Sequence, residues 1–454
     1  MDNTDSSQVA LIREAFHYQS RFAGSTMVFK IDFPVLEDPS FPILMRDLAL
    51  LSKTGFRVVI VPGAKERIDS VLKEYDIVST YLRDARITSA SAMPFVEMAA
   101  FHVANRLMTG LSADRVEAVI GNFVRARGLG VVDGADMENS GCVEKVLTDS
   151  IVKILGLGMV PILPCIGWSP AGRPYNLPSD EIALAASSAL GAVKLFIVSV
   201  HDGLKADALE GAGIPPGAVG ENGRITRLTP QEAEEILKAV SARTETLPFM
   251  KKVRSELKLA LGASKTGVER VHLIDARESG SVLRELFSNL GSGTMIYADE
   301  YESIRPLKTK DIADILRIME PLMKQGMLLQ RRAGDIQEKK EDYAVFEIDS
   351  SIHACGALHD WGEGQGEIAA IATDPAYADI GLGRRLVRYL IDRASKQGFR
   401  RVFVLTTKTQ DWFELLGFKE CPIESLPERR QKKYDQARKS KAYALTLERL
   451  QSQQ

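Results

Sequence analysis

The stretch from residue 367 to residue 384 combines the residue types that a phosphate-binding turn requires. Residues 367–373 form a short apolar run of strand-like composition, and Asp374-Pro375 interrupts it. Gly381 and Gly383 then open a segment, 384–397, whose apolar residues recur at helical spacing. Free backbone N–H groups and the positive end of a helix dipole converge at such a turn, and glycine lets a phosphate approach the backbone. The stretch therefore predicts an anion cradle between a strand and a helix.

A second chemically suggestive stretch is the basic run ERRQKKYDQARKSK, residues 428–441. The planar fork of arginine suits carboxylate ligands, so the run could hold an acidic substrate. A solvated helix face is the ordinary alternative for a charge run. Nucleic-acid binding is disfavoured, because the run is short and holds one aromatic residue, Tyr434, in a chain whose net charge is −2.

Composition narrows the class of protein. The chain has 454 residues, too many for one core, so two or three domains are expected. It is 45% hydrophobic and 26% charged, as globular proteins are. The four cysteines, Cys142, Cys165, Cys355 and Cys421, are scattered without metal-ligand spacing, which predicts free thiols in a reducing compartment and no metal site.

The first residues and the hydropathy favour a cytoplasmic protein. The opening MDNTDSSQVA is polar and acidic, unlike a secretory signal. No apolar run approaches the roughly 18 residues that a bilayer span needs, so no membrane association is expected.

The order of the predicted elements divides the chain. Over residues 1–290, strand-like runs such as 27–31, 57–61 and 194–200 alternate with helical patterns, which predicts an open, mostly parallel sheet with helices on both faces. Residues 291–303, which begin with the sequence GSG, are the expected linker. Residues 304–454 read as a helix, successive short strands, the glycine turn with its helix, and a further strand. The expected fold class is therefore α/β for the first domain and α+β for the second.

The second domain resembles the GNAT acetyltransferases, through its order strand-Pro-x-Tyr-x-x-x-Gly-x-Gly-helix. In that family the strand splays from its neighbour and binds the pantetheine arm of acetyl-CoA, while the helix N-terminus holds the pyrophosphate. The resemblance assigns these roles to Ala370, Ile371, Ala372, Thr373, Asp379, Ile380, Gly381, Leu382, Gly383 and Arg384. The family's Arg or Gln three residues before the first glycine is Ala378 here, so one side-chain phosphate contact is missing.

Longer stretches resemble one branch, the bacterial N-acetylglutamate synthases. They are GEIAAIATDPAY (366–377), LTTKTQDWFELLGF (405–418), YDQARKSK (434–441) and residues 304–332. The resemblance implies transfer of acetyl from acetyl-CoA to the α-amine of L-glutamate. Glu367 is then the candidate base and Thr406 the candidate partner of the leaving thiolate. The candidate partners of the glutamate carboxylates are Arg331, Arg332, Arg430, Arg438 and Lys439.

Residue type alone favours ordinary structural roles for Glu367 and Thr406 over catalytic ones. A Glu at the start of a strand is more often solvated than catalytic. A Thr in a strand is a good strand former.

The first domain resembles the amino-acid kinase fold, specifically acetylglutamate kinase, but with altered phosphate loops. Matching stretches are residues 14–30, 58–65, 85–90, 121–134, 175–183 and 268–296. Asp32 and Phe33 replace two glycines that would wrap ATP phosphates, and an anionic side chain and a bulky ring both oppose a phosphate there. Ala64, Lys65 and Val200 also depart from the kinase pattern, whereas Lys30, Arg86, Asn176 and Asp180 are retained. Phosphoryl transfer is not expected.

In the synthases such a domain binds L-arginine as a feedback signal. A mobile N-terminal helix, which residues 9–22 resemble, forms part of that site. The candidate arginine-site residues are Tyr18, Glu256, Glu269 and Glu278. The resemblance also implies a homo-oligomer, with a hexamer among the options.

Two other functions remain open at this point. One is a bifunctional synthase and kinase, which the lost glycines oppose. The other is a non-catalytic sensor of arginine and CoA that controls a partner, which the retained Glu367 and Thr406 oppose.

Overall fold

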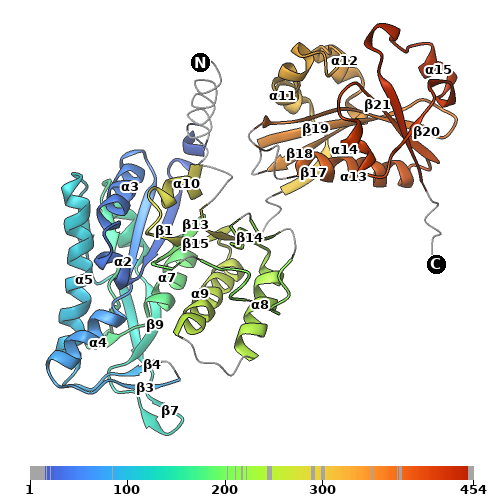
Figure 1. The fold of residues 1–454 in the computed structure, drawn as a ribbon. Helices are drawn as coiled ribbons and strands as arrows, with labels where there is room; N and C mark the ends of the chain where they lie inside the picture. Colours follow the sequence, from blue (N-terminus) through green and yellow to red (C-terminus); the bar gives the residue numbers. More distant parts are fainter. Residues whose placement is uncertain are drawn as a thin grey trace. The chain divides into compact units, whose positions relative to one another are not determined.

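A computed structural model gives the arrangement of the chain (Figure 1). The chain forms two compact units, Met1–Asp299 and Glu300–Gln454. The structure describes residues 16, 18–20, 22–83, 85–201, 203–209, 211–215, 218–220, 222–242, 248–287, 292–297, 302–348, 351–375, 377 and 381–447.

The first unit is built on an eight-stranded sheet in the order β14-β16-β15-β13-β1-β2-β10-β5. Its described pairs run parallel, except that β16 lies antiparallel to β15. The strands are β1 (Thr26–Ile31), β2 (Arg57–Pro62), β5 (Ala118–Ile120), β10 (Val160–Ile162), β13 (Lys194–Ser199), β14 (Arg227–Leu228), β15 (Arg270–Asp275) and β16 (Thr294–Tyr297).

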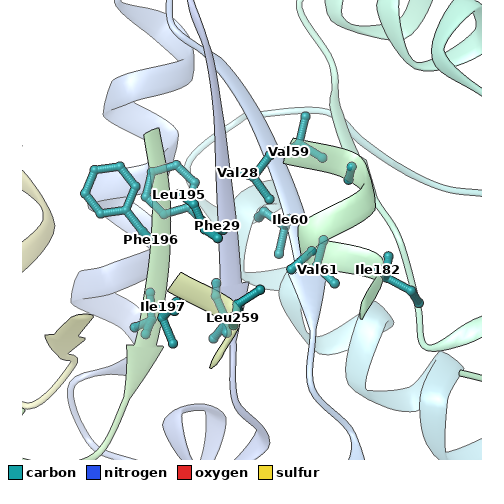
Figure 2. Close-up of a cluster of buried hydrophobic side chains, with 14 of the residues drawn as sticks. Val28, Phe29, Val59, Ile60, Val61, Ile182, Leu195, Phe196, Ile197 and Leu259 are labelled. Carbon is teal, nitrogen blue, oxygen red and sulfur yellow. The ribbon is translucent and has the colours of Figure 1, made fainter. Parts of the chain in front are cut away.

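The central strands are buried along their whole length because helices cover both faces of the sheet. All six residues of β1 and of β13 are buried. Phe29 of β1 stacks on Phe196 of β13 with ring centroids 4.6 Å apart. Figure 2 shows this core with Ile182 of α7 and Leu259 of α9 beside the strands. The sequence pattern that predicted a parallel sheet is therefore confirmed.

Nine described helices accompany this sheet in the first unit. They are α2 (Phe33–Glu37), α3 (Phe41–Lys53), α4 (Lys65–Glu74), α5 (Met93–Ala113), α6 (Thr148–Gly156), α7 (Ser179–Ala189), α8 (Pro230–Ala242), α9 (Pro248–Lys265) and α10 (Ser281–Phe287). Helix α9 was not predicted, although Met250, Val253, Leu257 and Ala260 form a buried stripe at helical spacing. Its many charged residues obscured that stripe.

Smaller sheets in the first unit were also missed. A four-stranded sheet has the order β12-β11-β6-β9, with β6 (Val124–Gly128), β9 (Gly141–Val146), β11 (Ile166–Trp168) and β12 (Pro174–Asn176). Two hairpins pair β3 (Thr80–Leu82) with β4 (Ala85–Ile87) and β7 (Val131–Val132) with β8 (Ala135–Asp136). These strands are short and partly exposed, so their periodicity is weak.

The second unit holds a seven-stranded mixed sheet in the order β17-β18-β19-β20-β21-β23-β22. The strands are β17 (Glu302–Pro306), β18 (Tyr343–Ile348), β19 (Ser351–Asp360), β20 (Gln365–Thr373), β21 (Arg401–Thr406), β22 (Lys419–Cys421) and β23 (Lys441–Thr446). The segment 291–303, the expected linker, contains β16 of the first sheet and the start of β17.

Helices cover both faces of the second sheet. They are α11 (Ile312–Lys324), α12 (Ala333–Glu338), α13 (Leu382–Lys396), α14 (Gln410–Glu414) and α15 (Glu428–Gln431). Neighbouring residues of β19 face opposite sides: Cys355 packs in a core with Ile315 of α11, while a Cβ on Gly356 would lie 3.0 Å from Leu390 of α13. Within the described part of the chain, no helix combines the length and the apolar character that crossing a bilayer requires.

Candidate active site

Strands β20 and β21 separate at the point where Glu367 stands. They pair in parallel at Gln365↔Arg401, Gly366↔Val402 and Glu367↔Phe403, and the pairing then stops. Beyond Glu367, β20 still pairs with β19 as far as Thr373. The edge of residues 368–373 that faces β21 therefore has no strand partner within the described residues. Its backbone N–H and C=O groups can bind an extended ligand.

A bulge shapes this open edge of β20. The register between β19 and β20 shifts between Cys355 and Ala357. Opposite this shift, Ala370 has φ +55°, in the left-handed region that non-glycine residues seldom adopt. The bulge re-aims the backbone groups around Ala370, one of the residues assigned to the pantetheine arm. Neighbouring Ile371 and Thr373 are partly buried, and Ala372 is buried.

The glycine turn ends in a helix N-terminus without a side-chain cap. Gly381 is the N-cap of α13 with φ +76°, and a Cβ there would meet nothing within 4 Å. A Cβ on Gly383 would lie 3.4 Å from Thr373 Oγ1 and 3.5 Å from the Trp412 ring. The uncapped N–H groups of the first helical turn suit an anion. Leu382 is buried and Arg384 exposed, while Asp379 and Ile380 lie outside the described residues.

The carboxylate of Glu367 is buried and paired with Arg430. Arg430 Nε donates to Glu367 Oε2 at 2.8 Å, and a terminal nitrogen donates to Oε1 at 3.0 Å. The indole Nε1 of Trp361 also donates to Oε2, at 2.8 Å. The side chains of Glu367 and Arg430 are 8% and 9% exposed, so neither is the solvated group that its residue type alone would suggest.

A pocket of about 100 Å³ adjoins this pair. It is lined by Met327, Leu328, Leu329, Arg331, Glu367, Ile368, Ala369, Ala370, Leu405, Arg430, Lys433, Tyr434, Asp435, Arg438 and Ser440. Three predicted cations, Arg331 and the basic-run residues Arg430 and Arg438, are thus brought together from two segments. Arg332 and Lys439 are exposed and do not line it, because Arg332 precedes α12 and Lys439 sits in a left-handed turn.

Hydrogen bonds tie the basic run to the rest of the pocket. Arg438 donates to the carbonyls of Gly326 and Met327 at 2.9 and 3.1 Å, and Tyr434 donates to the Ser440 carbonyl at 2.7 Å. The pocket residues Lys433, Tyr434 and Ser440 lie inside stretches already singled out, but no substrate role had been given to them.

The hydroxyl of Thr406 belongs to a local turn at the end of β21. Thr406 Oγ1 lies 2.7 Å from Thr409 Oγ1 and accepts from the Thr409 N–H at 3.0 Å. Thr406 is 7% exposed. If the Thr409 hydroxyl donates to Thr406, the Thr406 proton is available to another acceptor.

In the first unit, the carboxyl end of β1 carries a largely buried cluster of charges, to which α7 and α9 each contribute one residue. Lys30 pairs with Asp180 at 2.9 Å and with Asp32, and Asp32 pairs in turn with Lys252. Asp32 Oδ1 lies 3.0 Å from the position that a Cβ on Gly63 would take. The residue that replaces a kinase glycine thus places its carboxylate against the second phosphate loop and neutralises Lys30.

Burial and ion pairing act against each other on the pKa values in this cluster. Burial would raise the pKa of Asp32, but Lys30 and Lys252 outweigh it and lower the pKa to about 2. Burial would lower the pKa of Lys30, but Asp180 and Asp32 outweigh it and raise the pKa. Asp32 is therefore an anion, and Lys30 a cation, at neutral pH.

The other retained kinase residues serve internal contacts. Arg86 donates to Asp69 at 2.7 Å, and Asn176 donates to Thr88 at 3.0 Å. Both side chains therefore have partners within the fold.

The four candidate arginine-site residues are not brought together. Glu256 hydrogen-bonds His201 at 2.9 Å, beyond the carboxyl end of β13, and Glu278 follows the carboxyl end of β15. Tyr18, by contrast, stacks on Phe22, and Lys194 at the amino end of β13 lies over the Phe22 ring. Glu269 is exposed beside the amino end of β15. Strand direction thus separates Glu256 and Glu278 from Tyr18.

A buried acid close to Lys194 was missed. Glu285 of α10 lies 2.8 Å from His272 Nδ1 and accepts from Gly293 N at 3.0 Å. Burial lowers the pKa of His272 to about 4, although Glu285 opposes this effect. His272 Nε2 has no hydrogen-bond partner within the described residues. Both residues lie in the stretch 268–296 that carried the kinase resemblance, so the sequence held the signal.

Comparison with known proteins matches this two-part architecture. A model of the amino acid kinase family matches residues 35–257, and a model of the acetyltransferase (GNAT) family matches residues 311–418. The amino-acid acetyltransferase of Pasteurella multocida (strain Pm70) is 32% identical over 443 residues, which cover 96% of this chain and 97% of that protein. The chain belongs to the amino-acid acetyltransferase family. That family's protein from Pseudomonas fluorescens (strain SBW25) is 31% identical over 447 residues.

Solved structures of the family agree with the fold. N-acetylglutamate synthase from Neisseria gonorrhoeae, complexed with coenzyme A and L-arginine, has a TM-score of 0.81 at 31% identity and covers 97% of this chain and 99% of its own. The same synthase complexed with coenzyme A and N-acetyl-glutamate has a TM-score of 0.59 at 31% identity, with the same coverage. The chain thus carries a kinase-like unit and a GNAT unit, as the resemblance implied.

Proposed function

We propose that the protein transfers the acetyl group of acetyl-CoA to the α-amine of L-glutamate. The observation that carries the proposal is the separation of β20 from β21 at Glu367, directly beside a pocket with three arginines. The open strand edge suits the thioester arm, and the arginines suit a dicarboxylate. The names and ligands of the synthase structures support the same substrates.

The cradle at α13 fits the diphosphate of acetyl-CoA. A Cβ at Gly383 would reach van der Waals contact with Thr373 and Trp412, so glycine leaves more room at this end of the helix. Gly381, Leu382 and Gly383 would offer their N–H groups to the diphosphate, with Arg384 exposed nearby. Ala370, Ile371, Ala372 and Thr373 would hold the pantetheine arm along the open edge. Because the backbone makes this cradle, the absence of a cation at Ala378 is tolerated.

Glu367 is positioned to act as the base. The α-ammonium of glutamate must lose a proton before its nitrogen attacks the thioester carbon. Among the described residues, two donors reach Oε2 and one reaches Oε1, so Oε1 keeps a free acceptor site. That oxygen can take the proton, directly or through one water. As the C–N bond forms, the C–S bond breaks, and the thiolate needs a proton or a hydrogen bond. The hydroxyl of Thr406 is our candidate donor.

Arg430 is the best-placed partner for the α-carboxylate of glutamate. The α-amine and α-carboxylate are attached to one carbon, so an amine near Glu367 brings its carboxylate near the guanidinium that already holds Glu367. Arg430 would then exchange part of its contact with Glu367 for the substrate. Arg331 and Arg438, on other walls of the pocket, would meet the side-chain carboxylate.

The kinase-like unit is proposed to bind L-arginine rather than ATP. The buried Glu285 carboxylate and His272 Nε2, which has no partner among the described residues, offer acceptors to a guanidinium. Phe22, on which Tyr18 stacks, lies against Lys194. The internal ion pair of Lys30 with Asp32 opposes ATP binding. A homo-oligomer, with a hexamer among the options, stays a prediction.

One assay tests these proposals together. The protein is supplied with acetyl-CoA, L-glutamate and ATP, with and without L-arginine, and free CoA, N-acetylglutamate and ADP are measured. We expect CoA and N-acetylglutamate in equal amounts, no ADP, and a change in rate with arginine. ADP formation would overturn the non-kinase assignment, and no CoA release would overturn the acetyltransferase proposal in favour of a sensor. L-aspartate and D-glutamate serve as matched acceptors, because one missing methylene changes binding by only ~1–3 kcal/mol.

A further inference from the structure

Trp361 stands in the turn that connects β19 to β20, six positions before Glu367. Gly362, Glu363 and Gly364 all have positive φ, and Trp361 N donates to the Gln365 carbonyl at 3.2 Å. The indole packs against a small core that includes Phe403 and Leu426. A tight turn and a packed ring therefore hold the indole in one orientation.

Three polar groups of the active site meet at this indole. Its Nε1–H donates to Glu367 Oε2 at 2.8 Å. The Arg430 guanidinium lies 5.3 Å from the ring centroid, and Lys433 Nζ lies 5.5 Å from it. Among aromatic side chains, tryptophan alone combines a face for cations with a neutral N–H donor that it cannot lose at physiological pH.

In the proposed reaction, the hydrogen bonds that Arg430 and Trp361 donate to Glu367 behave differently. When Arg430 turns towards the α-carboxylate of glutamate, Glu367 loses hydrogen bonds from the group that now holds both of its oxygens. The Trp361 N–H does not depend on Arg430 and stays on Oε2. A neutral donor also stabilises the carboxylate without placing another positive charge beside the substrate ammonium.

We infer that Trp361 is a positioning residue for the reaction: its N–H anchors Glu367 Oε2 and leaves Oε1 aimed at the substrate amine while Arg430 binds the substrate carboxylate. The inference rests on the proposed function. It concerns how the base is held, and it assigns to Trp361 no contact with either substrate.

The test removes the N–H while keeping an aromatic ring. Trp361→Phe keeps a face for Arg430, and replacement of Trp361 by 3-benzothienylalanine keeps the bicyclic shape with sulfur in place of N–H. Trp168→Phe is the control, because Trp168 belongs to β11 in the other unit. For each protein, kcat and KM for both substrates, the pH dependence of kcat/KM, coenzyme A binding and the thermal midpoint are measured.

We expect both Trp361 variants to lose roughly tenfold in kcat, the effect of one hydrogen bond to a charged group. The acid limb of kcat/KM should move to higher pH, because a donor to the ionised carboxylate is gone. Coenzyme A binding and the KM for acetyl-CoA should not change. Trp168→Phe should match the unaltered protein.

Normal kcat and pH profile in the benzothienylalanine protein would overturn the inference, whether or not Trp361→Phe folds. Equal losses in coenzyme A binding and thermal midpoint would also overturn it, because they would show a general packing role. An unaltered protein that fails to acetylate glutamate would instead refute the proposed function itself.

Discussion

Arg430 holds both carboxylate oxygens of Glu367, at 2.8 and 3.0 Å, although the two residues are 63 positions apart in the chain. The residue expected to bind the substrate is thus bound to the residue expected to activate it. The substrate glutamate would also bind this guanidinium through a carboxylate. Glu367 therefore occupies, in part, the contact that the substrate must take over, so substrate binding and release of the base are coupled.

Replacement of Glu367 by Gln should lower kcat by about 100-fold or more at neutral pH, as expected for loss of a general base. The amide cannot take a proton, and Arg430 loses its anionic partner. Steady-state rates at several pH values check this. Glu363→Gln, in the exposed turn just before β20, is the matched control and should keep the normal rate. A fully active Glu367→Gln protein would exclude Glu367 as the base.

Replacement of Arg430 by Lys should raise the KM for glutamate more than the KM for acetyl-CoA. Lysine keeps the charge but cannot reproduce the two-pronged contact with a carboxylate. The expected rise is about tenfold, from ~1.4 kcal/mol of lost binding. Arg429→Lys is a close control, because Arg429 is exposed next to the buried Arg430. Equal KM values in the two variants would contradict the assignment of Arg430.

Replacement of Asp32 by Asn should reduce the stability of the first unit at neutral pH. The pKa of Asp32 is lowered from 3.8 to about 2, so its ionised form stabilises the fold. This contribution, about 2 kcal/mol, is present above pH 4 and is lost as pH falls through 3.8 towards 2. Urea unfolding at pH 7 and at the lowest pH that keeps the protein folded should show the difference between the proteins shrinking with acidity. Asp76→Asn, at an exposed turn, should change little at either pH.

Replacement of Glu285 by Gln should weaken the response to L-arginine. The amide keeps the size of the side chain, but it removes the buried anion that a guanidinium would meet. Rates at increasing arginine concentration, each normalised to the same protein without arginine, give the measurement. Glu269→Gln and Glu278→Gln test the acids first suggested by sequence. A larger loss of the arginine response in Glu278→Gln than in Glu285→Gln would place the arginine site at the carboxyl end of β15 instead.

Sequence patterns predicted the elements that bury apolar residues at regular spacing. The expected strands 27–31, 57–61 and 194–200 match β1, β2 and β13 to within one residue at each end, because each is a compact apolar run. Helix α9 was not predicted because charged residues such as Lys252 and Glu256 interrupt its apolar periodicity. Those side chains point inward and join the charged cluster at Asp32. Local sequence does not show that a charge is buried against a partner far along the chain.

Contacts between residues far apart in the chain also explain why sequence alone did not predict the full active site. Glu367 and the basic run were found by motif, but the pairing of Glu367 with Arg430 depends on how β20 and α15 meet in space. Trp361 had no motif to mark it. Glu256 and Glu278 were chosen for their charge near a matching stretch, and strand direction places them away from Tyr18. Residue type identified the candidate site residues, and the topology of the fold determined which of them lie close together.

The Asp32 carboxylate against Gly63 would make the proposed loss of a phosphate site hard to reverse. Restoring glycine at position 32 alone would take Asp32 from Lys252, leaving it only the longer contact with Glu256 at 3.8 Å, and would remove one of the two anions that hold Lys30. Breaking one member of a buried ion pair costs about 3–5 kcal/mol, a large share of the stability of a typical domain. If the unit is non-catalytic as proposed, a return to phosphoryl transfer would require several residues of this cluster to change together.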